Sequence, residues 1–363
     1  MNQNKTKVAI IFGGRSPEHQ ISLLSAQNVL LSLDRTKYEP VLIGIDKEGT
    51  WHLSDSLNLI NKEDPNNIAL GQLDAPVLLS QNTGDKILVS KTDAEVLTGI
   101  DVIFPVLHGT YGEDGSIQGL AKLANIPCVG CGILGSAVGM DKDIMKHVLR
   151  SCKIAVADWV TVRNSSEGVD YTAITKKLGN ELFIKPANLG SSVGVSFSEN
   201  KKTFFESLEK ALQYDPKVII EEKISGREIE CAVLGNHKPI ASIPGEVSVP
   251  GGFYSYENKY LNEKGAELFI PAELDKQQVK SVQRLALDTY TFLECRGMTR
   301  VDMFLLADNN LIINEVNTIP GFTNISMYPK LWEKSGLPQS ELITRLIELA
   351  LEEHRLENEL LLV

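Results

Sequence analysis

The sequence contains no apolar run close to the roughly 20 residues that a membrane-spanning helix needs. Its first residues, MNQNKTKVAIIFGG, lack the layout of a secretion signal, because the apolar stretch is short and leads directly into a glycine turn. No fixed-period repeat or low-complexity tract is present, which argues against a solenoid. We therefore expect a cytoplasmic protein without membrane contact, and 363 residues favour two or three globular domains.

Cysteine and positive charge are also scarce. Five cysteines, an odd number, argue against a disulfide framework. Cys128 and Cys131 form a C-x-x-C motif, but no second pair lies nearby, so two small buried residues beside glycines are favoured over a redox or zinc site. A net charge of -11 argues against sequence-independent binding to nucleic acid. An anionic small substrate would instead need local positive charge.

The first third of the chain alternates short β-branched runs with helical patterns. KVAIIF, EPVLIGID and IDVIFPVLHG have the composition of strands, and ISLLSAQNVLLSL has apolar residues at helical spacing. This alternation predicts a parallel α/β domain over residues 1–139. Gly13-Gly14 and HGTYGEDGS follow two of these strands, and loops at the carboxyl ends of parallel strands are where such folds bind ligands.

The pattern changes near Met140 and predicts two further units. MDKDIMKHVLRSC is helical and leads to strands around ADWVTV, ELFIKP and VIIEEKI, which indicate a small α+β unit over residues 140–222. Residues 223–363 hold the strands REIECAVLG, TRVDMFLL and LIINEVN and the helix KQQVKSVQRLALDTYTFLE. We expect the terminal amphipathic helix ELITRLIELALEEH to pack on the core or to form a dimer surface.

A hairpin is predicted where TRVDMFLL and LIINEVN are separated by the turn-forming residues ADNN. If these four residues form the loop, Leu306 pairs with Leu311, and Asp302 falls opposite Glu315. Two carboxylates that face each other repel and destabilise the pair. A divalent cation between them would remove that objection.

The same register places Arg300 opposite Asn317 and all four polar side chains on one face. Two carboxylates and an amide oxygen are hard ligands suited to Mg²⁺, which commonly also takes substrate phosphates and water. Arg300 beside such a site indicates phosphate groups, or charge that develops during their transfer. The alternative is a solvated polar hairpin face, which the neighbouring apolar residues disfavour.

A second element with phosphate-binding character is KPANLGSSVGV, residues 185–195. Lys185 lies on an apolar strand, and the small-residue loop after it could cover phosphate oxygens with backbone N–H groups. The segment lacks the G-x-x-x-x-G-K-[ST] pattern, so it is not a Walker loop. Taken alone, a flexible surface turn explains it equally well.

Eight segments together resemble the ATP-grasp superfamily and, within it, the D-alanine–D-alanine ligase family. They occur in the family's order and span nearly the whole chain: FGGRSPEHQISLLSA, HGTYGEDGSIQG, MDK, KPANLGSSVGV, EEKISGREIECAVLG, FYSYENKY, TRVDMF and INEVNTIPGFTNIS. The resemblance implies an ATP-grasp fold of three domains with ATP between the second and third. Fold alone would imply only ATP-dependent carboxylate activation, so the first, sixth and eighth segments carry the substrate assignment.

The resemblance also implies the reaction and its participants. Two D-alanine molecules are joined for peptidoglycan precursor synthesis through an acyl phosphate, with ATP and Mg²⁺ or Mn²⁺, two ions in all. No nucleic-acid or membrane partner is implied, and a homodimer is expected by analogy. Two alternatives stay open: a depsipeptide ligase that uses D-lactate as acceptor, and a nucleotide-binding regulator that has kept the fold and lost the chemistry.

The resemblance further implies roles for individual residues around the nucleotide and the metal. Residues expected to contact phosphates, adenine or ribose are Lys142, Lys185, Glu222, Lys223, Ile224, Glu228, Phe253 and Lys259. The implied metal ligands are Asp302, Glu315 and Asn317, the set that the hairpin argument also selects. Arg300 and the backbone N–H of Gly321 are the implied oxyanion donors.

Around the amino acids, the resemblance makes Glu18 the group that binds the first ammonium, although a carboxylate there could also cap the following helix. Ser191 and Tyr260 are its implied hydrogen-bond partners, and a tyrosine at 260 implies preference for an amine acceptor over D-lactate. Residues expected near the substrates are His108, Ser326 and the Met327 backbone. His108 has a structural alternative, fixing a glycine loop. A lid over residues 251–265 is also expected.

Overall fold

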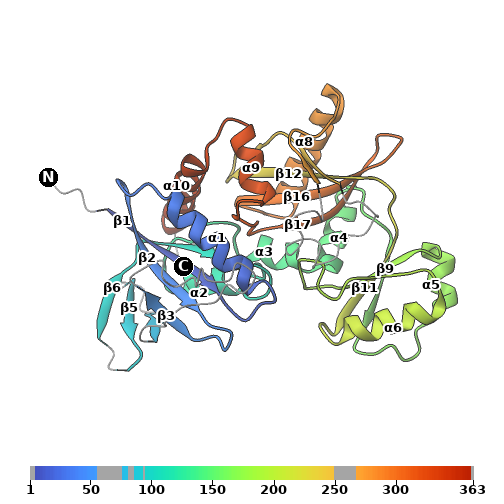
Figure 1. Cartoon of the computed structure of the whole chain (residues 1–363), viewed down its shortest axis with the longest axis horizontal. Helices are drawn as coiled ribbons and strands as arrows, with labels where there is room; N and C mark the ends of the chain where they lie inside the picture. Colours follow the sequence, from blue (N-terminus) through green and yellow to red (C-terminus); the bar gives the residue numbers. More distant parts are fainter. Residues whose placement is uncertain (1–4, 55–75, 81–85, 93–94, 249–266, 361–363) are drawn as a thin grey trace.

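A computed structural model describes residues 5–54, 76–80, 86–92, 95–248 and 267–360 of the chain. Figure 1 shows an elongated molecule, with the N-terminal sheet at one end of the long axis, a small α/β unit at the other, and a larger sheet between them. No helix within the described ranges is long and apolar enough to cross a membrane.

The N-terminal sheet is built around β1 (Thr6–Gly13), which pairs in parallel with β2 (Tyr38–Ile45) and β7 (Val102–Val106). The strand β3 (Trp51–Ser54) adds to β2 in antiparallel orientation. Residues 8–12 of β1 are buried, as expected of a central parallel strand that is covered on both faces. The predicted helix is α1 (His19–Ser32), so the parallel α/β prediction is confirmed.

A three-stranded antiparallel sheet and two helices complete this part of the chain. The strands are β4 (Val77–Leu79), β5 (Ile87–Ser90) and β6 (Val96–Gly99). The helices are α2 (Ser116–Leu123) and α3 (Ile133–Met140). All five cysteines of the chain lie in described residues and are free thiols. Cys131 is buried as predicted, whereas Cys128 is half-buried.

The central sheet has the order β10-β9-β11-β8. Its antiparallel strands are β8 (Trp159–Arg163), β9 (Leu182–Pro186), β10 (Ser196–Ser198) and β11 (Lys217–Glu222). The helices α5 (Tyr171–Leu178) and α6 (Lys201–Leu212) share one hydrophobic core with β9 and β11. The helix α4 (Lys142–Ser151) precedes this sheet and begins directly after α3.

The C-terminal sheet has the order β15-β14-β12-β16-β17, with β13 paired to β12. Its strands are β12 (Arg227–Gly235), β13 (Ile240–Ala241), β14 (Gly245–Ser248), β15 (Glu267–Phe269), β16 (Gly297–Leu305) and β17 (Leu311–Asn317). The helices are α8 (Lys276–Phe292), α9 (Met327–Lys334) and α10 (Gln339–Asn358). The sequence interpretation included α8 and α10 but not α9.

Two hydrophobic cores connect these units. One joins residues of β1, β7 and α1 with α9, α10 and one face of the C-terminal sheet, so the terminal helix packs in the core. The other places Met145 and Leu149 of α4 against α8 and the opposite face of that sheet. Each sheet draws its strands from one of the three predicted ranges, whereas α4 contributes its apolar side to the C-terminal unit. The domain boundaries stay a prediction.

The tip of the β16–β17 hairpin differs from the predicted register. Leu305 pairs with Leu311, so the predicted pairing of Leu306 with Leu311 is wrong. The Leu306 N–H donates to the carbonyl of Asn310 at 2.9 Å, which places both residues inside the turn. The turn is therefore longer than the four residues that its composition suggested.

A β-bulge restores the predicted register further along the hairpin. It lies between Asp302 and Met303, where β17 contributes one extra residue. Beyond it, Asp302 lies opposite Glu315 and Arg300 lies opposite Asn317, so these two predicted pairs are confirmed. The bulge is what brings the two acids face to face.

Candidate active site

The hairpin face gathers one guanidinium group and two carboxylates. Arg300 donates through Nε and a terminal nitrogen to the two oxygens of Asp302, both at 2.7 Å. Its Nε also lies 2.9 Å from Oε2 of Glu230, a residue of the neighbouring strand β12. The Asn317 amide nitrogen donates to Asp302 at 3.0 Å. All except Asn317 are buried, so this is a low-dielectric polar cluster and not a solvated surface.

Lys142 connects the hairpin to the small-residue loop after β9. Its Nζ lies 3.3 Å from Oε2 of Glu315 and donates to the carbonyl of Leu189 at 2.8 Å. Its backbone N–H donates to the carbonyl of Ala187 at 3.0 Å. The first residue of α4 therefore brings the hairpin and the loop together. A phosphate group near this lysine would also lie near Glu315.

The three predicted metal ligands lie together on the hairpin, and their donor set fits a hard cation such as Mg²⁺. Three N–H groups occupy Asp302, whereas a carboxylate offers about four acceptor positions. Turning the Asn317 amide over would present its oxygen. Within the described ranges no group of three His, Cys, Asp or Glu side chains could hold a metal ion. The hairpin set is of a different kind, because its third member is the amide of Asn317.

A second charged cluster lies beneath the loop, between α4 and the central sheet. Glu221 binds Lys146 through Oε1 at 2.6 Å and Lys185 through Oε2 at 2.5 Å. Burial raises the pKa of the Glu221 carboxyl, but the two ammonium groups outweigh burial and bring it to about 2. Burial lowers the pKa of Lys185, yet the charge of Glu221 raises it more, so this lysine stays protonated. The cluster holds two positive charges and one negative charge.

Glu18 meets the loop from the opposite side. It occupies the N-cap position of α1 without a capping hydrogen bond from its side chain, so the capping alternative is not what its carboxylate does. Instead the Ser191 hydroxyl donates to Oε1 of Glu18. Ser191 has a left-handed φ of 51°, which is uncommon for a residue other than glycine. Glycine is favoured at position 109, because its φ of 72° is left-handed and a Cβ there would lie 2.7 Å from Oε2 of Glu18.

His108 uses both ring nitrogens to hold the turn that contains Gly321. Its Nδ1 lies 2.9 Å from the carbonyl of Ile319, which identifies this nitrogen as the donor. Its Nε2 lies 3.0 Å from the Ser25 hydroxyl, which accepts from the Phe322 N–H. Burial lowers the pKa of His108, in agreement with a neutral ring. His108 therefore has the structural role that was the alternative, but it fixes the turn around Gly321 and not its own glycine-rich segment. Its role near the substrate stays a prediction.

Glu113 ties the two glycine-containing loops together. Its Oε1 accepts from the Gly109 N–H at 3.0 Å, and its Oε2 accepts from Thr318 and Ile319 N–H groups at 3.1 and 3.2 Å. Burial, and then the neighbouring charge of Glu18, raise the pKa of the Glu113 carboxyl to about 8. The loop after β7 is therefore fixed to the turn after β17.

Ser326 and Gly321 lie against each other at that turn. A Cβ at Gly321 would lie 2.6 Å from the Ser326 hydroxyl oxygen, so a larger residue there would displace the Ser326 side chain. The Ser326 hydroxyl accepts from the Thr323 N–H at 3.0 Å, and Ser326 is the N-cap residue of α9. Met327 follows as a buried core residue. The Ser326 hydroxyl and the backbone of Gly321 therefore lie together at this turn.

The predicted adenine segment lies at the end of β11. The Glu222 N–H donates to the Asp158 carbonyl at 3.1 Å, and the Glu222 side chain accepts from the Asp158 N–H at 2.7 Å. The Lys223 N–H donates to the Glu181 carbonyl at 3.1 Å. These two N–H groups are engaged within the protein, so an adenine ring would use other groups of the segment.

Five further nucleotide or substrate predictions have different outcomes. Ile224 follows the segment and is half-buried, and Glu228 lies half-buried on β12, where its charge helps to raise the pKa of Lys185. The remaining predicted residues, together with the predicted lid, lie outside the described residues: Phe253, Lys259 and Tyr260.

Four residues of the site were missed by the sequence interpretation, three of them buried and one, Glu113, half-buried. Lys146 lies one helical turn after Lys142 and thus on the same face of α4. Glu221 interrupts the apolar strand VIIEE, and Glu230 interrupts the buried strand REIECAVLG, so a carboxylate in an apolar strand was the available signal. Glu113 lies in HGTYGEDGS, a segment from which only His108 was selected.

Comparison with known proteins identifies relatives over nearly the full length. The family models described as D-ala D-ala ligase N-terminus and C-terminus match residues 7–131 and 148–348. A D-alanine–D-alanine ligase of Oceanobacillus iheyensis is 49% identical over 98% of both chains.

Two solved structures resemble the whole chain. That of the D-alanine-D-alanine ligase from Coxiella burnetii has a TM-score of 0.82 at 38% identity, covering 98% of each chain. That of the VanG D-Ala:D-Ser ligase from Enterococcus faecalis has a TM-score of 0.84 at 37% identity, covering 96% of this chain and all of the other.

Proposed function

The chain belongs to the D-alanine–D-alanine ligase family, and on that premise we propose that it joins two D-alanine molecules with conversion of ATP to ADP and phosphate. The product, D-alanyl-D-alanine, would serve peptidoglycan precursor synthesis. The observation that carries the proposal is the meeting of three elements at Lys142, which contacts Glu315 of the hairpin and Leu189 of the loop whose Ser191 reaches Glu18.

In this reaction the carboxylate of the first D-alanine attacks the γ-phosphate, which forms an acyl phosphate and releases ADP. The amine of the second D-alanine then attacks the acyl carbon, a C–N bond forms, the amine loses its proton, and the bond to phosphate breaks. Phosphoryl transfer asks the protein mainly for positioning and charge neutralisation. The two charged clusters of the site support the assignment of both tasks to this chain.

The phosphate groups are assigned to the positively charged side of the site. Lys142 and Lys185 would bind them, with the small-residue loop above. Asp302, Glu315 and Asn317 would hold Mg²⁺, which supplies neutralisation of the charge on the transferred phosphoryl group. Support comes from the opposed acids of the hairpin and from the protonated state of Lys185.

The reacting carbonyl is assigned to the turn after β17. Arg300 and the Gly321 N–H would stabilise the oxyanion of the tetrahedral intermediate. Support comes from the His108 and Glu113 hydrogen bonds, which fix this turn to the N-terminal loops and would hold the Gly321 backbone in place. Ser326, with the backbone of Met327, would bind the carboxylate of the second D-alanine.

Glu18 is assigned to the ammonium group of the first D-alanine. It is buried and lies near Glu113, so a cation there would offset the repulsion between the two acids. Ser191 orients the carboxylate through its hydroxyl. The roles of Phe253, Lys259 and Tyr260 stay predictions, as does the homodimer.

The second candidate function concerns the acceptor. The structural similarity to a D-Ala:D-Ser ligase favours testing a hydroxylated amino acid, and D-lactate tests the depsipeptide alternative. Tyr260, which bears on this choice by family resemblance, lies outside the described residues.

The deciding experiment supplies the protein with ATP, Mg²⁺ and an equimolar mixture of D-alanine, D-serine and D-lactate. ADP release and all condensed products are measured together, with L-alanine replacing D-alanine as the control. We expect ADP release that depends on D-alanine, with D-alanyl-D-alanine as the main product. A main product containing D-serine or D-lactate would reassign the acceptor. ATP binding without turnover would identify a regulator.

A further inference from the structure

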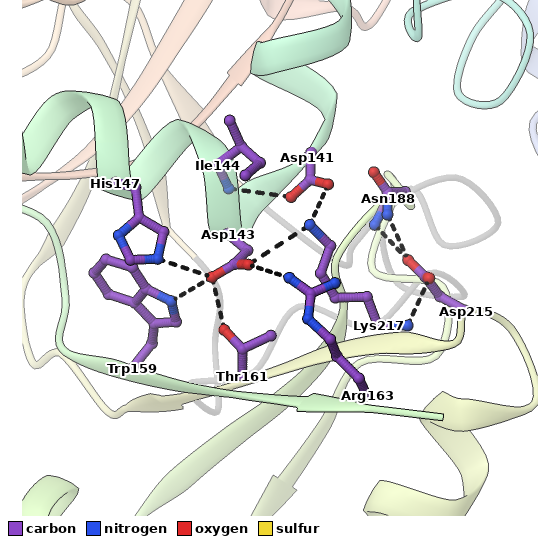
Figure 2. A network of polar contacts seen from close by, with 10 residues as sticks. All are labelled: Asp141, Asp143, Ile144, His147, Trp159, Thr161, Arg163, Asn188, Asp215 and Lys217. Carbon is purple, nitrogen blue, oxygen red and sulfur yellow. Dashed lines mark hydrogen bonds and ion pairs between the residues drawn. The ribbon is translucent and has the colours of Figure 1, made fainter. Parts of the chain in front are cut away.

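Asp143, the second residue of α4, accepts hydrogen bonds from one edge of the central sheet (Figure 2). Its Oδ1 accepts from Trp159 Nε1 at 2.8 Å and from the Thr161 hydroxyl at 2.6 Å. Its Oδ2 accepts from the Arg163 guanidinium at 3.2 Å. These donors are alternate residues of β8 and so project from the same face of that strand. The first turn of α4 is thereby fixed across β8.

Lys217, the first residue of β11, adds a cation between the two acids that flank Lys142. Its Nζ contacts Asp141 and lies 3.6 Å from Oδ2 of Asp143. Asp141 is also the N-cap of α4, since its side chain accepts from the Ile144 N–H at 3.1 Å. One lysine of the sheet therefore holds the residues on both sides of Lys142.

The same end of β11 also fixes the start of the small-residue loop. Asp215 accepts from the Asn188 N–H at 2.8 Å and from its side-chain amide at 2.9 Å. Its other oxygen accepts from the Lys217 N–H at 2.9 Å. The loop and the first turn of α4 thus share one attachment to the sheet.

Lys142 lies between Asp141 and Asp143, so the contacts of these two acids act on the first turn of α4, one turn before Lys146 binds Glu221 of β11. Its ammonium group lies between the Leu189 carbonyl and Glu315, and both contacts depend on where the first turn of α4 sits. We propose that Asp143 is a positioning residue, which holds this turn on the central sheet so that Lys142 faces the nucleotide phosphates. The proposal rests on the proposed function of Lys142.

The electrostatics of Asp143 suit this role. Burial raises the pKa of its carboxyl, but hydrogen bonds from Thr161 and Trp159 and the charge of Lys217 outweigh burial and hold it below its usual range. The group is therefore a carboxylate near neutral pH. An amide at this position would keep the shape, but it would turn an N–H group toward donors and lose the attraction to Lys217.

A purely structural role is the competing explanation, and a double-mutant cycle separates the two. The measured quantity is the dissociation constant of adenylyl imidodiphosphate with Mg²⁺, determined by calorimetry. We expect Asp143→Asn to raise it by about tenfold in the native background. In the Lys142→Ala background the same change should raise it by less than about twofold, because the side chain that it positions is gone.

Thr161→Val serves as a second variant in case Asp143→Asn does not fold. It removes one donor to Asp143 without changing charge, and we expect a rise of about threefold that also disappears in the Lys142→Ala background. Asp170→Ala is the matched control, since Asp170 caps α5 in the same unit and lies outside the network. It should lower the melting temperature without changing nucleotide affinity.

Three results would overturn the proposal. These are equal losses of affinity in both backgrounds, no loss in the native background, or a loss of the same size for Asp170→Ala. Unchanged affinity in Lys142→Ala alone would refute the phosphate role of Lys142 and with it the need for positioning. Ligase turnover measured on the same samples shows whether the proposed function itself survives.

Discussion

The two charged clusters of the site differ in the sign of their excess charge. The cluster beneath the loop has two ammonium groups, Lys146 and Lys185, for one carboxylate, Glu221. The hairpin cluster has three carboxylates, Glu230, Asp302 and Glu315, for two cations, Arg300 and Lys142. The first suits phosphate groups and the second suits a metal cation, and Lys142 lies where the two meet.

If the two clusters bind the groups proposed for them, burial alone does not decide what a polar cluster binds. Both clusters are drawn largely from buried side chains, and in both a carboxylate is shared between two partners. What differs is the ratio of acids to bases that the strands and α4 bring together. Removing an acid should therefore act mainly on turnover in the hairpin cluster and mainly on the free energy of unfolding in the cluster beneath the loop.

The largest effect is expected from Glu315→Gln, which removes the acid opposite Asp302. Turnover should fall by about 1,000-fold, because the metal would lose a charged ligand near the transferred phosphoryl group. The free energy of unfolding should stay within about 0.5 kcal/mol or rise, since the repulsion between opposed acids is relieved. Steady-state ADP release and urea unfolding of the same preparation check both parts.

Glu221→Gln should act on stability more than on any other property. It leaves Lys146 and Lys185 buried beside a neutral amide, and breaking a buried ion pair in this way costs about 3 kcal/mol. Urea unfolding at pH 7 measures the loss. The control is Glu209→Gln on the exposed side of α6, which should change stability by less than about 0.5 kcal/mol. Equal losses for both variants would contradict the charge assignment.

Asp302→Asn should have a different effect on stability from Glu315→Gln. Unlike Glu315, Asp302 accepts two hydrogen bonds from the buried Arg300, so its removal should cost about 2 kcal/mol of stability in addition to turnover. Glu230 remains beside Arg300 and limits the loss. Unfolding curves for Asp302→Asn and Glu315→Gln, compared side by side, test this. Stability that is unchanged in both would show that Arg300 does not depend on Asp302.

The smallest expected effect is on the pH dependence of stability. Glu221 has a pKa of about 2 in the folded protein and an ordinary value of 4.5. Its contribution should be fully present above pH 4.5 and should decline as the pH falls toward 2. The difference in unfolding free energy between the native protein and Glu221→Gln should therefore be constant from pH 7 to 5 and smaller by about 1 kcal/mol near pH 3.5.

Some of this site follows from sequence and some does not. The opposition of Asp302 and Glu315 was predicted from an assumed four-residue loop, and it holds only because a longer turn and a β-bulge offset each other. Local pattern does not reveal such a bulge. The Glu221 cluster needs α4 packed against β11, a tertiary contact without a local signal. The helix α9 was missed because MYPKLWEK has a proline, although it falls in the first turn, where proline is tolerated.

The central proposal is that the hairpin binds a cation while Lys142 and Lys185 bind phosphate. Its most direct test is the affinity for adenylyl imidodiphosphate measured across Mg²⁺ concentrations in the native protein, Glu315→Gln and Lys185→Met. We expect Glu315→Gln to lose most of the Mg²⁺-dependent gain in affinity and to bind normally without Mg²⁺. Lys185→Met should bind about tenfold more weakly at every Mg²⁺ concentration and keep the gain. Loss of the Mg²⁺ dependence in Lys185→Met, with its retention in Glu315→Gln, would contradict the account.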